Sequence, residues 1–215
     1  LAKSADFNKK FTLNIFHIIF LYIEETIMKK RTKFTIFLFI VGLICLGALG
    51  LYSSQLTKIN EKQDNIYKEW TTLSEYYRRR SDITPQLMNL LHSVRDSQIK
   101  KECDELNNLW KVAKADCESY KKHYLNEDTF AGHKAAQDAF EEQLNKVFSA
   151  ANNYSVIKNS PEYSKLEKEF RTLAENIKDK REDFNKRVQI YNDTIAAFPE
   201  MITAKINGNT PLFFY

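Results

Sequence analysis

Apolar residues recur through most of the chain at alternating intervals of three and four positions, the spacing that places them on one face of an α-helix. Four separate runs show this spacing between residues 66 and 198. In chain order the runs are Ile66, Trp70, Leu73, Tyr77, Leu87, Leu91 and Val94; Cys103, Leu106, Trp110, Ala113, Cys117, Tyr120 and Tyr124; Phe140, Leu144, Val147, Ala151 and Tyr154; and Tyr163, Leu166, Phe170, Leu173, Ile177, Phe184, Val188, Tyr191, Ile195 and Phe198. Each run predicts a helix that buries its apolar face against neighbouring helices.

The residues between the runs fit turns and helix caps. Asp96 and Ser97 suit a turn and an N-cap between the first and second helices. The polar segment 125–129 connects the second and third helices, with Asp128 or Thr129 as the candidate cap. Each connection is short, which favours helices that pack next to their neighbours in the chain.

The fourth helix has the clearest start and stop signals. Ser160 is placed as an N-cap, Pro161 as the first helical residue and Glu162 in the first turn. Pro199 marks a break near the end of this helix. With only 5 Gly and 4 Pro in 215 residues, we predict an all-α protein in which residues 53–198 form an antiparallel up-down four-helix bundle with long helices.

The N-terminal part of the chain has a different pattern. Residues 34–57 carry no charge, and the apolar stretch 34–52 is 19 residues long. At a rise of about 1.5 Å per residue, this stretch nearly crosses a hydrocarbon layer of about 30 Å. Four basic residues precede it within residues 28–33. We therefore predict that residues 28–52 form a basic flank and an uncleaved transmembrane signal anchor.

A cleaved signal peptide is the alternative interpretation of this stretch. The apolar run is longer than a typical signal-peptide core, and no clear small-x-small cleavage site closes it. The denser basic cluster precedes the span, so the positive-inside rule places residues 53–215 outside the cytoplasm. Residues 1–27 start with Leu1, and Met28 heads the basic flank. We expect residues 1–27 to be a non-native upstream or disordered extension.

The net charge of +4 lies entirely in the N-terminal part. Residues 1–52 carry seven basic and three acidic residues, whereas residues 53–215 carry 25 of each, interleaved along the helices. Nucleic-acid-binding proteins show a basic patch or stripe. The distribution here is typical of solvated helix faces, so we expect no nucleic-acid partner.

Two arginines occupy positions in the helical runs where an apolar residue is expected. Arg80 interrupts the first run and Arg181 the fourth. A buried guanidinium must be paired or must extend to water. Asp82, Glu175 and Asp179 are candidate partners. We interpret the arginines as a polar layer or edge position of the bundle, and an anion or ligand pocket is the alternative.

An aromatic residue followed by asparagine occurs twice, seven positions apart, in Phe184-Asn185 and Tyr191-Asn192. Since the aromatic residues lie in the fourth run, the asparagines lie on one flank of it. We expect each amide to bond to a neighbouring helix and to set the register between helices. A pair of ligand-binding amides is the alternative.

Catalytic and metal-binding patterns are weak. The histidines show no His-x-x-x-His or Glu-x-x-His spacing. Cys103 and Cys117 fit small apolar core residues, and no Gly-rich phosphate loop or nucleophile elbow is present. We expect no enzymatic activity, cofactor or metal.

Three ordered motifs resemble the bacterial LemA family: "RRRSDITPQL", "YSVIKNSPEY" and "REDFNKRVQIYNDTIAAFP". The resemblance covers residues 28–215. The motif positions that it singles out are Arg80, Asp82, Pro85, Tyr154, Lys158, Arg181, Asn185, Tyr191, Asn192, Phe198 and Pro199. The chain departs from the family pattern at Ser155, Phe184 and Ala174, which stand where proline, tyrosine and glutamate are usual.

The resemblance implies a single-pass protein of the bacterial cell membrane with a helical-bundle body and no established enzymatic activity. We expect a membrane-anchored interaction or scaffold protein that is envelope-related, with protein partners of unknown identity. A ligand-sensing bundle is the alternative. It would act through a membrane partner, because the 17 residues after Phe198 include Lys205 and are too short to return across the membrane. A hydrolase is a third class that an activity screen would test.

The last segment, residues 199–215, is not expected to be helical throughout because it contains Gly208 and Pro211. It ends in three aromatic residues, Phe213, Phe214 and Tyr215, which would form an unusual apolar patch in water. We expect this tail to fold back onto the bundle, and docking on a partner or on lipid is the alternative.

Overall fold

The computed structural model describes the backbone of residues 2–94, 96–119 and 124–215, and the side chains of residue 28 and of residues 30–94, 96–119 and 124–215. These residues form helices and loops and contain no strand, so the all-α prediction is confirmed. The helices are α1 (Ala2–Leu91), α2 (Ser97–Ser119), α3 (Glu127–Ala151), α4 (Ser155–Lys158), α5 (Pro161–Ala196) and α6 (Glu200–Ile206).

The chain divides into two compact units, Leu1–Ser54 and Gln55–Tyr215, with the boundary inside α1. Within the described part of the first unit, the side chains of residues 30–51 are all exposed. Within the residues that the structure describes, one helical segment, Lys30–Leu91, is long and apolar enough to cross a membrane. None of its most apolar stretch is buried.

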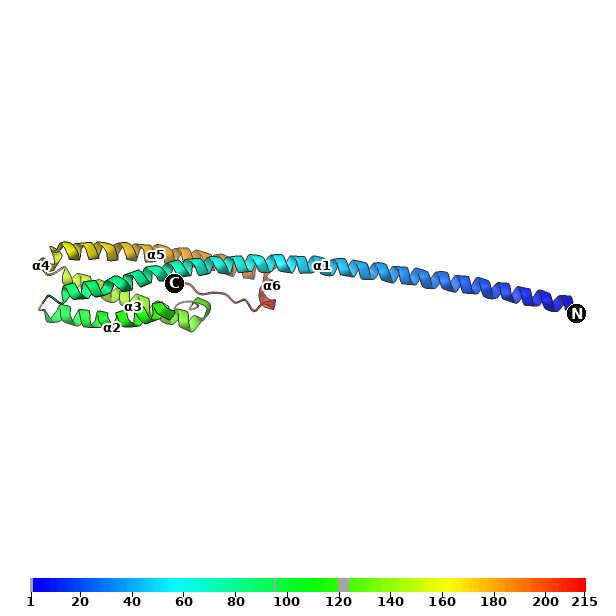
Figure 1. The fold of residues 1–215 in the computed structure, drawn as a ribbon, viewed down its shortest axis with the longest axis horizontal. Helices are drawn as coiled ribbons and strands as arrows, with labels where there is room; N and C mark the ends of the chain where they lie inside the picture. The colour runs from blue at the N-terminus through cyan, green and yellow to red at the C-terminus, as the bar shows by residue number, and fades with distance from the viewer. Residues whose placement is uncertain (1, 95, 120–123) are drawn as a thin grey trace. The chain divides into compact units, whose positions relative to one another are not determined.

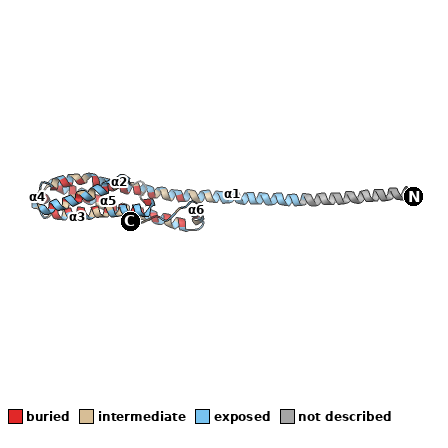
Figure 2. Ribbon diagram, turned by 90° about the horizontal axis from the view of Figure 1, so that it is seen from below, coloured by how far each residue is buried: buried red, intermediate tan, exposed pale blue. Residues whose placement is uncertain are grey.

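In the second unit, the part of α1 that begins at Gln55 packs with α2, α3 and α5, and these long segments run in alternating directions (Figure 1). Buried residues recur along each of these segments (Figure 2). Two short helices were not predicted: α4 lies between α3 and α5, and α6 follows the break at Pro199. Leu173 and Tyr191, both in the fourth predicted run, are buried.

One residue of that run is misplaced by the sequence pattern. Phe198 was assigned to the buried face, but it is 77% exposed. The cause is local, because α5 ends at Ala196 and residue 198 no longer follows the helical phase. Tyr120, assigned to the second run, lies outside the described residues.

The capping residues decide where the helices begin. Asp96 accepts hydrogen bonds from the backbone N–H groups of Gln98 (2.8 Å) and Ile99 (3.1 Å), as the sequence predicted for the start of α2. The predicted cap of α3 was wrong: Asn126, not Asp128 or Thr129, is the N-cap. Its extended backbone lets its side chain accept from Thr129 N–H at 3.1 Å, which starts the helix earlier.

The start of α5 follows its predicted signals. Ser160 is the N-cap and accepts from the backbone N–H of Tyr163 at 3.4 Å. Pro161 is the first helical residue and Glu162 lies in the first turn. The fixed φ of proline and its missing N–H are compatible with that position.

Pro85 lies inside α1 rather than at its end. Proline has no backbone N–H, so the carbonyl four residues earlier loses its helical partner. That carbonyl belongs to Ser81, and the indole Nε1–H of Trp110 in α2 donates to it at 2.8 Å. The bond satisfies the carbonyl and links α1 to α2 at this level.

Candidate functional site

The side chain of Arg80 is buried among three helices. The residue is 1% exposed, and its Nη1 pairs with Glu141 Oε2 at 3.1 Å. Its Nη2 donates to the backbone oxygen and to Oε1 of Gln137, at 3.3 and 3.1 Å. The guanidinium lies 5.4 Å from the ring centroid of Tyr77 and 5.1 Å from that of Phe140. Burial lowers the pKa of Arg80 while Glu141 opposes this, and an arginine remains charged in proteins.

Arg181 lies on α5 next to the same carboxylate. Its Nε donates to the hydroxyl of Tyr77 at 2.6 Å, and its Nη2 pairs with Asp138 Oδ1 at 2.8 Å and Glu141 Oε2 at 3.7 Å. The guanidinium lies 5.0 Å from the ring centroid of Tyr215 and 5.6 Å from that of Tyr77. Burial lowers the pKa of Arg181, but Tyr77 and the two carboxylates outweigh burial and raise it overall.

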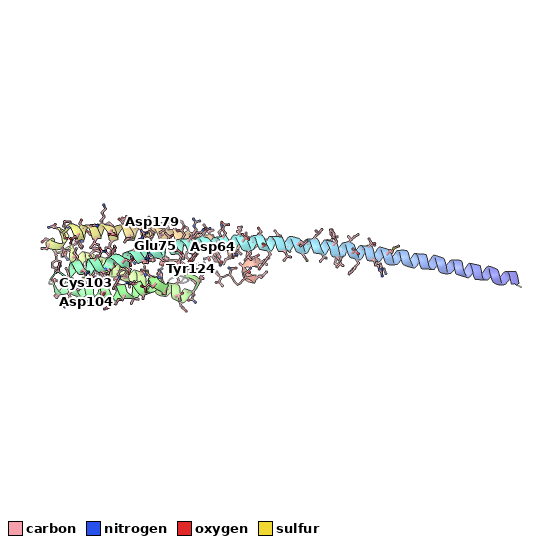
Figure 3. The ribbon with its side chains drawn as sticks, viewed as in Figure 1. Asp64, Glu75, Cys103, Asp104, Tyr124 and Asp179 are labelled. Carbon is pink, nitrogen blue, oxygen red and sulfur yellow. The ribbon has the colours of Figure 1, made fainter. Side chains whose placement is uncertain are left out.

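We call these interacting residues the arginine layer: Tyr77, Arg80, Gln137, Asp138, Glu141 and Arg181. The candidate partners named from the sequence were wrong. Asp82, Glu175 and Asp179 are exposed on the same helices as the arginines, and Figure 3 shows Asp179 along α5. The carboxylates that pair with the arginines come from α3. The arginine side chains point into the bundle, so they meet residues of the neighbouring helix and not the exposed carboxylates of their own helices.

The polar contacts continue from the arginine layer to α2. Gln137 Nε2 donates to the backbone oxygen of Ala113 at 3.3 Å and lies 3.4 Å from both Asp116 Oδ2 and Cys117 Sγ. His133 Nδ1 bonds to Asp116 Oδ2. Burial, reinforced by Asp116, raises the pKa of the Cys117 thiol to about 11. This thiol is therefore protonated at neutral pH.

The two asparagines of the aromatic-Asn repeat bind the C-terminal tail. Asn192 Nδ2 donates to the Leu212 carbonyl at 3.0 Å, and its Oδ1 accepts from the Leu212 N–H at 2.9 Å. Asn185 makes the equivalent pair with Tyr215, at 3.5 and 2.9 Å. Each asparagine amide thus forms hydrogen bonds with both the N–H and the carbonyl group of one tail residue. The expected bonds to a neighbouring helix were wrong, because the tail occupies that flank of α5.

The tail folds back onto the bundle and packs three of its last four side chains against it. Leu212 is buried and Phe213 and Tyr215 pack partly against the core, whereas Phe214 is 43% exposed. Burial, reinforced by Tyr77, raises the pKa of Tyr215. We call the surface that receives the tail the tail groove, and its residues are Trp70, Phe130, Phe184, Asn185 and Asn192.

Helix α6 connects α5 to the tail. Glu200 pairs with Lys58 of α1, and Thr203 and Ala204 are buried. The opposite face of α6 exposes Ile202 and Ile206. The tail then begins at Gly208, whose φ of 69° is accessible to glycine at little cost.

The remaining motif residues have separate places. The Tyr154 hydroxyl bonds to Asp96 and so supports the residue that caps α2. Lys158 is exposed in the last turn of α4. Asp82 is exposed as well, and Pro199 precedes the first residue of α6. These residues do not form one site with the arginine layer.

The third predicted run began too late and therefore missed part of the arginine layer. Phe130, His133 and Gln137 continue the same three-four spacing upstream of Phe140, and all of them are buried. A histidine and a glutamine at buried positions are the signal that sequence analysis could have used. Glu141, next to Phe140, gave no signal of its own.

A cleft of about 190 Å³ adjoins the arginine layer between α1, α3 and α5. Arg80 and Glu141 form its polar side, and Phe148, Phe170 and Ala174 contribute apolar surface. Among the described side chains, no three His, Cys, Asp or Glu residues are grouped as metal ligands. The arrangement therefore offers internal ion pairing and a small amphipathic cleft.

Comparison with known proteins places the chain in a family. No curated protein and no solved structure matches it significantly. A family model does match residues 69–215, which include the arginine layer and the tail groove but not the N-terminal part of the expected resemblance. On this match, the chain belongs to the LemA family.

Proposed function

We propose that this protein is a membrane-anchored interaction or scaffold module of the bacterial envelope, with a non-catalytic helical bundle outside the cytoplasm. The observation that carries the proposal is the uncharged stretch 34–52, whose side chains are exposed through residue 51. Eighteen or more apolar residues without charge favour a lipid environment over water. The basic cluster before the stretch favours a cytoplasmic N-terminus.

The chemistry of the bundle supports a non-catalytic role. Arg80 and Arg181 pair with Glu141 and Asp138, so their charges stabilise the bundle from within. The buried thiols are poor nucleophiles, because burial raises the pKa of Cys103 and Cys117 to about 11. Partner binding would then use the exposed surface, where large apolar side chains such as Val156 and Val112 lie.

Membrane fractionation combined with site-specific photo-crosslinking tests this proposal. We expect the full chain to stay in the membrane pellet after alkaline washing. A crosslinker at exposed Val156 or Val112 should give a reproducible set of adducts, and one at buried Leu87 should serve as the negative control. Release into the soluble fraction, or a mature N-terminus beyond residue 50, would contradict the anchor. A cytoplasm-specific reporter that is active after Tyr215 would contradict the orientation.

A ligand-sensing bundle is the second candidate, and the cleft beside Arg80 is the observation that favours it. Its charged and apolar walls suit a small amphipathic molecule. Native mass spectrometry of the purified full chain should then detect a retained small molecule. Ala174→Leu, which fills the cleft from α5, should abolish retention, and Ala139→Leu on the half-buried flank of α3 is the control. Absence of any retained molecule favours the interaction module.

A further inference from the structure

We propose that the tail groove is a peptide-binding site that exchanges its occupant, and that the C-terminal tail of a second copy of this chain binds there in trans. The proposal rests on the interaction function proposed above, because it names a partner for the bundle. It starts from the way in which Asn185 and Asn192 hold the tail.

The two amides recognise backbone and not side chains. Asn185 and Asn192 are seven residues apart, which on a helix corresponds to about 10.5 Å. Leu212 and Tyr215 are three residues apart, which in an extended chain corresponds to about 10 Å. The repeat on α5 therefore matches the repeat of an extended peptide that runs antiparallel to it. Such main-chain bonding is the chemistry by which proteins bind extended peptides.

Specificity comes from three side chains of the tail. Leu212, Phe213 and Tyr215 pack against the aromatic end of the bundle, whereas Phe214 is exposed. The Tyr215 ring lies 5.1 Å from Phe130 and 5.8 Å from Phe184, measured between centroids. An occupant of this groove must therefore be extended and must place an aromatic residue three positions after a leucine-sized one. The tail of a second copy meets both conditions.

The tail can be released without unfolding a helix. It has no regular secondary structure after α6, and it begins at Gly208, whose positive φ glycine adopts at little cost. Its backbone and its first residues are held by the bonds of Asn185 and Asn192 and by those of Asn209 to Ala204 and Tyr191. Its release exposes the side chains of Leu212, Phe213 and Tyr215 but breaks no helix, so it costs less free energy than unfolding of the whole bundle.

Two features favour a second copy over an unrelated peptide. First, Ile202 and Ile206 are exposed on one face of α6, the helix from which the tail leaves, so apolar surface is available there to a second copy that receives the tail. Residues 209–215 span at most about 23 Å, so the exchanging bundles must lie close together. Second, exchange of an identical segment is a low-cost route to a dimer, and a shared membrane would raise the effective concentration of the second copy.

Complementation between two full-length variants in detergent micelles tests the exchange. One variant keeps its tail but carries Asn185→Ala and Asn192→Ala, and the other keeps its groove but lacks residues 209–215. We expect these two, carrying different tags, to co-purify at least about tenfold better than two copies of either variant alone, since the loss of four hydrogen bonds weakens binding by at least this order. Gln189→Ala with Asn176→Ala, which remove amides outside the tail groove, form the control for the first variant.

A photo-crosslinker at Phe214 in the otherwise natural chain gives a second measurement that does not depend on the folding of the truncated variant. We expect crosslinked dimers that Asn192→Asp abolishes, because a carboxylate cannot donate to the Leu212 carbonyl. Dimers that form regardless of tail and amides overturn the proposal, as does the absence of dimers in both assays. The proposal is also overturned if a free peptide of residues 207–215 binds the truncated chain while the two variants form no heterodimer. The tail groove would then bind peptides but not the tail of a second copy. None of these failures affects the membrane anchor or the adducts at Val156.

Discussion

The two ends of the bundle close in different ways. Beside α4, the core is mostly aliphatic and includes Leu87, Leu91 and Leu106, all fully buried on helices that follow one another closely in the chain. At the other end, the core is richer in aromatic residues, including Trp70 and Phe184, and the non-helical tail completes it. The first end therefore depends mainly on packing between regularly spaced helix faces. The second depends on hydrogen bonds between segments 20 and 30 residues apart.

The largest effect is expected at the aliphatic end. Leu87→Ala removes a fully buried side chain from the larger core cluster, and it should lower the free energy of unfolding by about 2–5 kcal/mol. Urea unfolding of the full chain in micelles, followed by circular dichroism, measures the loss. A loss below about 0.5 kcal/mol, the scale of surface substitutions, would show that this end is not closed by tight packing.

Deletion of residues 209–215 should lower the free energy of unfolding by less than Leu87→Ala does. The decrease cannot exceed the free energy with which the tail docks on the bundle. We expect hydrogen exchange to accelerate around Trp70 and Phe184 while the amides around Leu106 keep their protection. Equal acceleration at both ends would mean that the bundle opens as one unit and would remove the distinction between them.

Asn192→Ala tests the amides separately from the aromatic packing. It removes two bonds to Leu212 and should lower the free energy of unfolding by about 1–3 kcal/mol without reducing helix content, since alanine is the better helix former. Gln189→Ala, at an exposed position of the same helix, should change it by less than about 0.5 kcal/mol. Similar decreases in the free energy of unfolding for the two variants would show that the bonds from Asn192 to the tail backbone do not stabilise the protein.

The smallest effect concerns the pH dependence of α6. The hydrogen bond from Lys58 holds the pKa of Glu200 below its ordinary value. A carboxyl with a lowered folded-state pKa stabilises above its unfolded-state pKa, and this contribution is lost as the pH falls through the folded-state value. We therefore expect the protection factors of the Thr203 and Ala204 amides, which correct for the intrinsic pH dependence of exchange, to fall below about pH 4.5. The protection factors of Glu200→Gln should not change over the same range, and identical profiles for both proteins would contradict the assignment.

The sequence predicted the long helices of the bundle and most of their ends, but not α4 and α6, because long helices depend on local residues and regular spacing. Spacing identified the buried faces, and Ser160 with Pro161 marked the start of α5. The asparagines were recognised as unusual, but a flank position on a helix is equally compatible with a neighbouring helix and with a returning tail. Only the course of the chain after Pro199 decides between the two.

The carboxylates that pair with the arginines could not be predicted from the sequence, for a related reason. The three-four spacing indicates that Arg80 and Arg181 face the interior of the bundle. It does not indicate how α3 is rotated about its axis, and this rotation decides which carboxylates of α3 meet the arginines. Glu141 lies beside a buried phenylalanine and is itself partly exposed, so it resembles any surface carboxylate in the sequence. Gln137 of this layer and the neighbouring His133 continue the buried three-four spacing of α3, and they are the polar residues that the sequence could have identified.

Hydrogen exchange at the backbone amides of Leu212 and Tyr215 tests the central claim most directly, namely that Asn192 and Asn185 hold the tail by its backbone. Both N–H groups donate to asparagine side chains at 2.9 Å. We predict that both amides exchange more slowly than that of exposed Phe214, and that Asn192→Ala removes the protection of Leu212 first. Exchange of all three amides at the rate of an unstructured peptide would contradict the account.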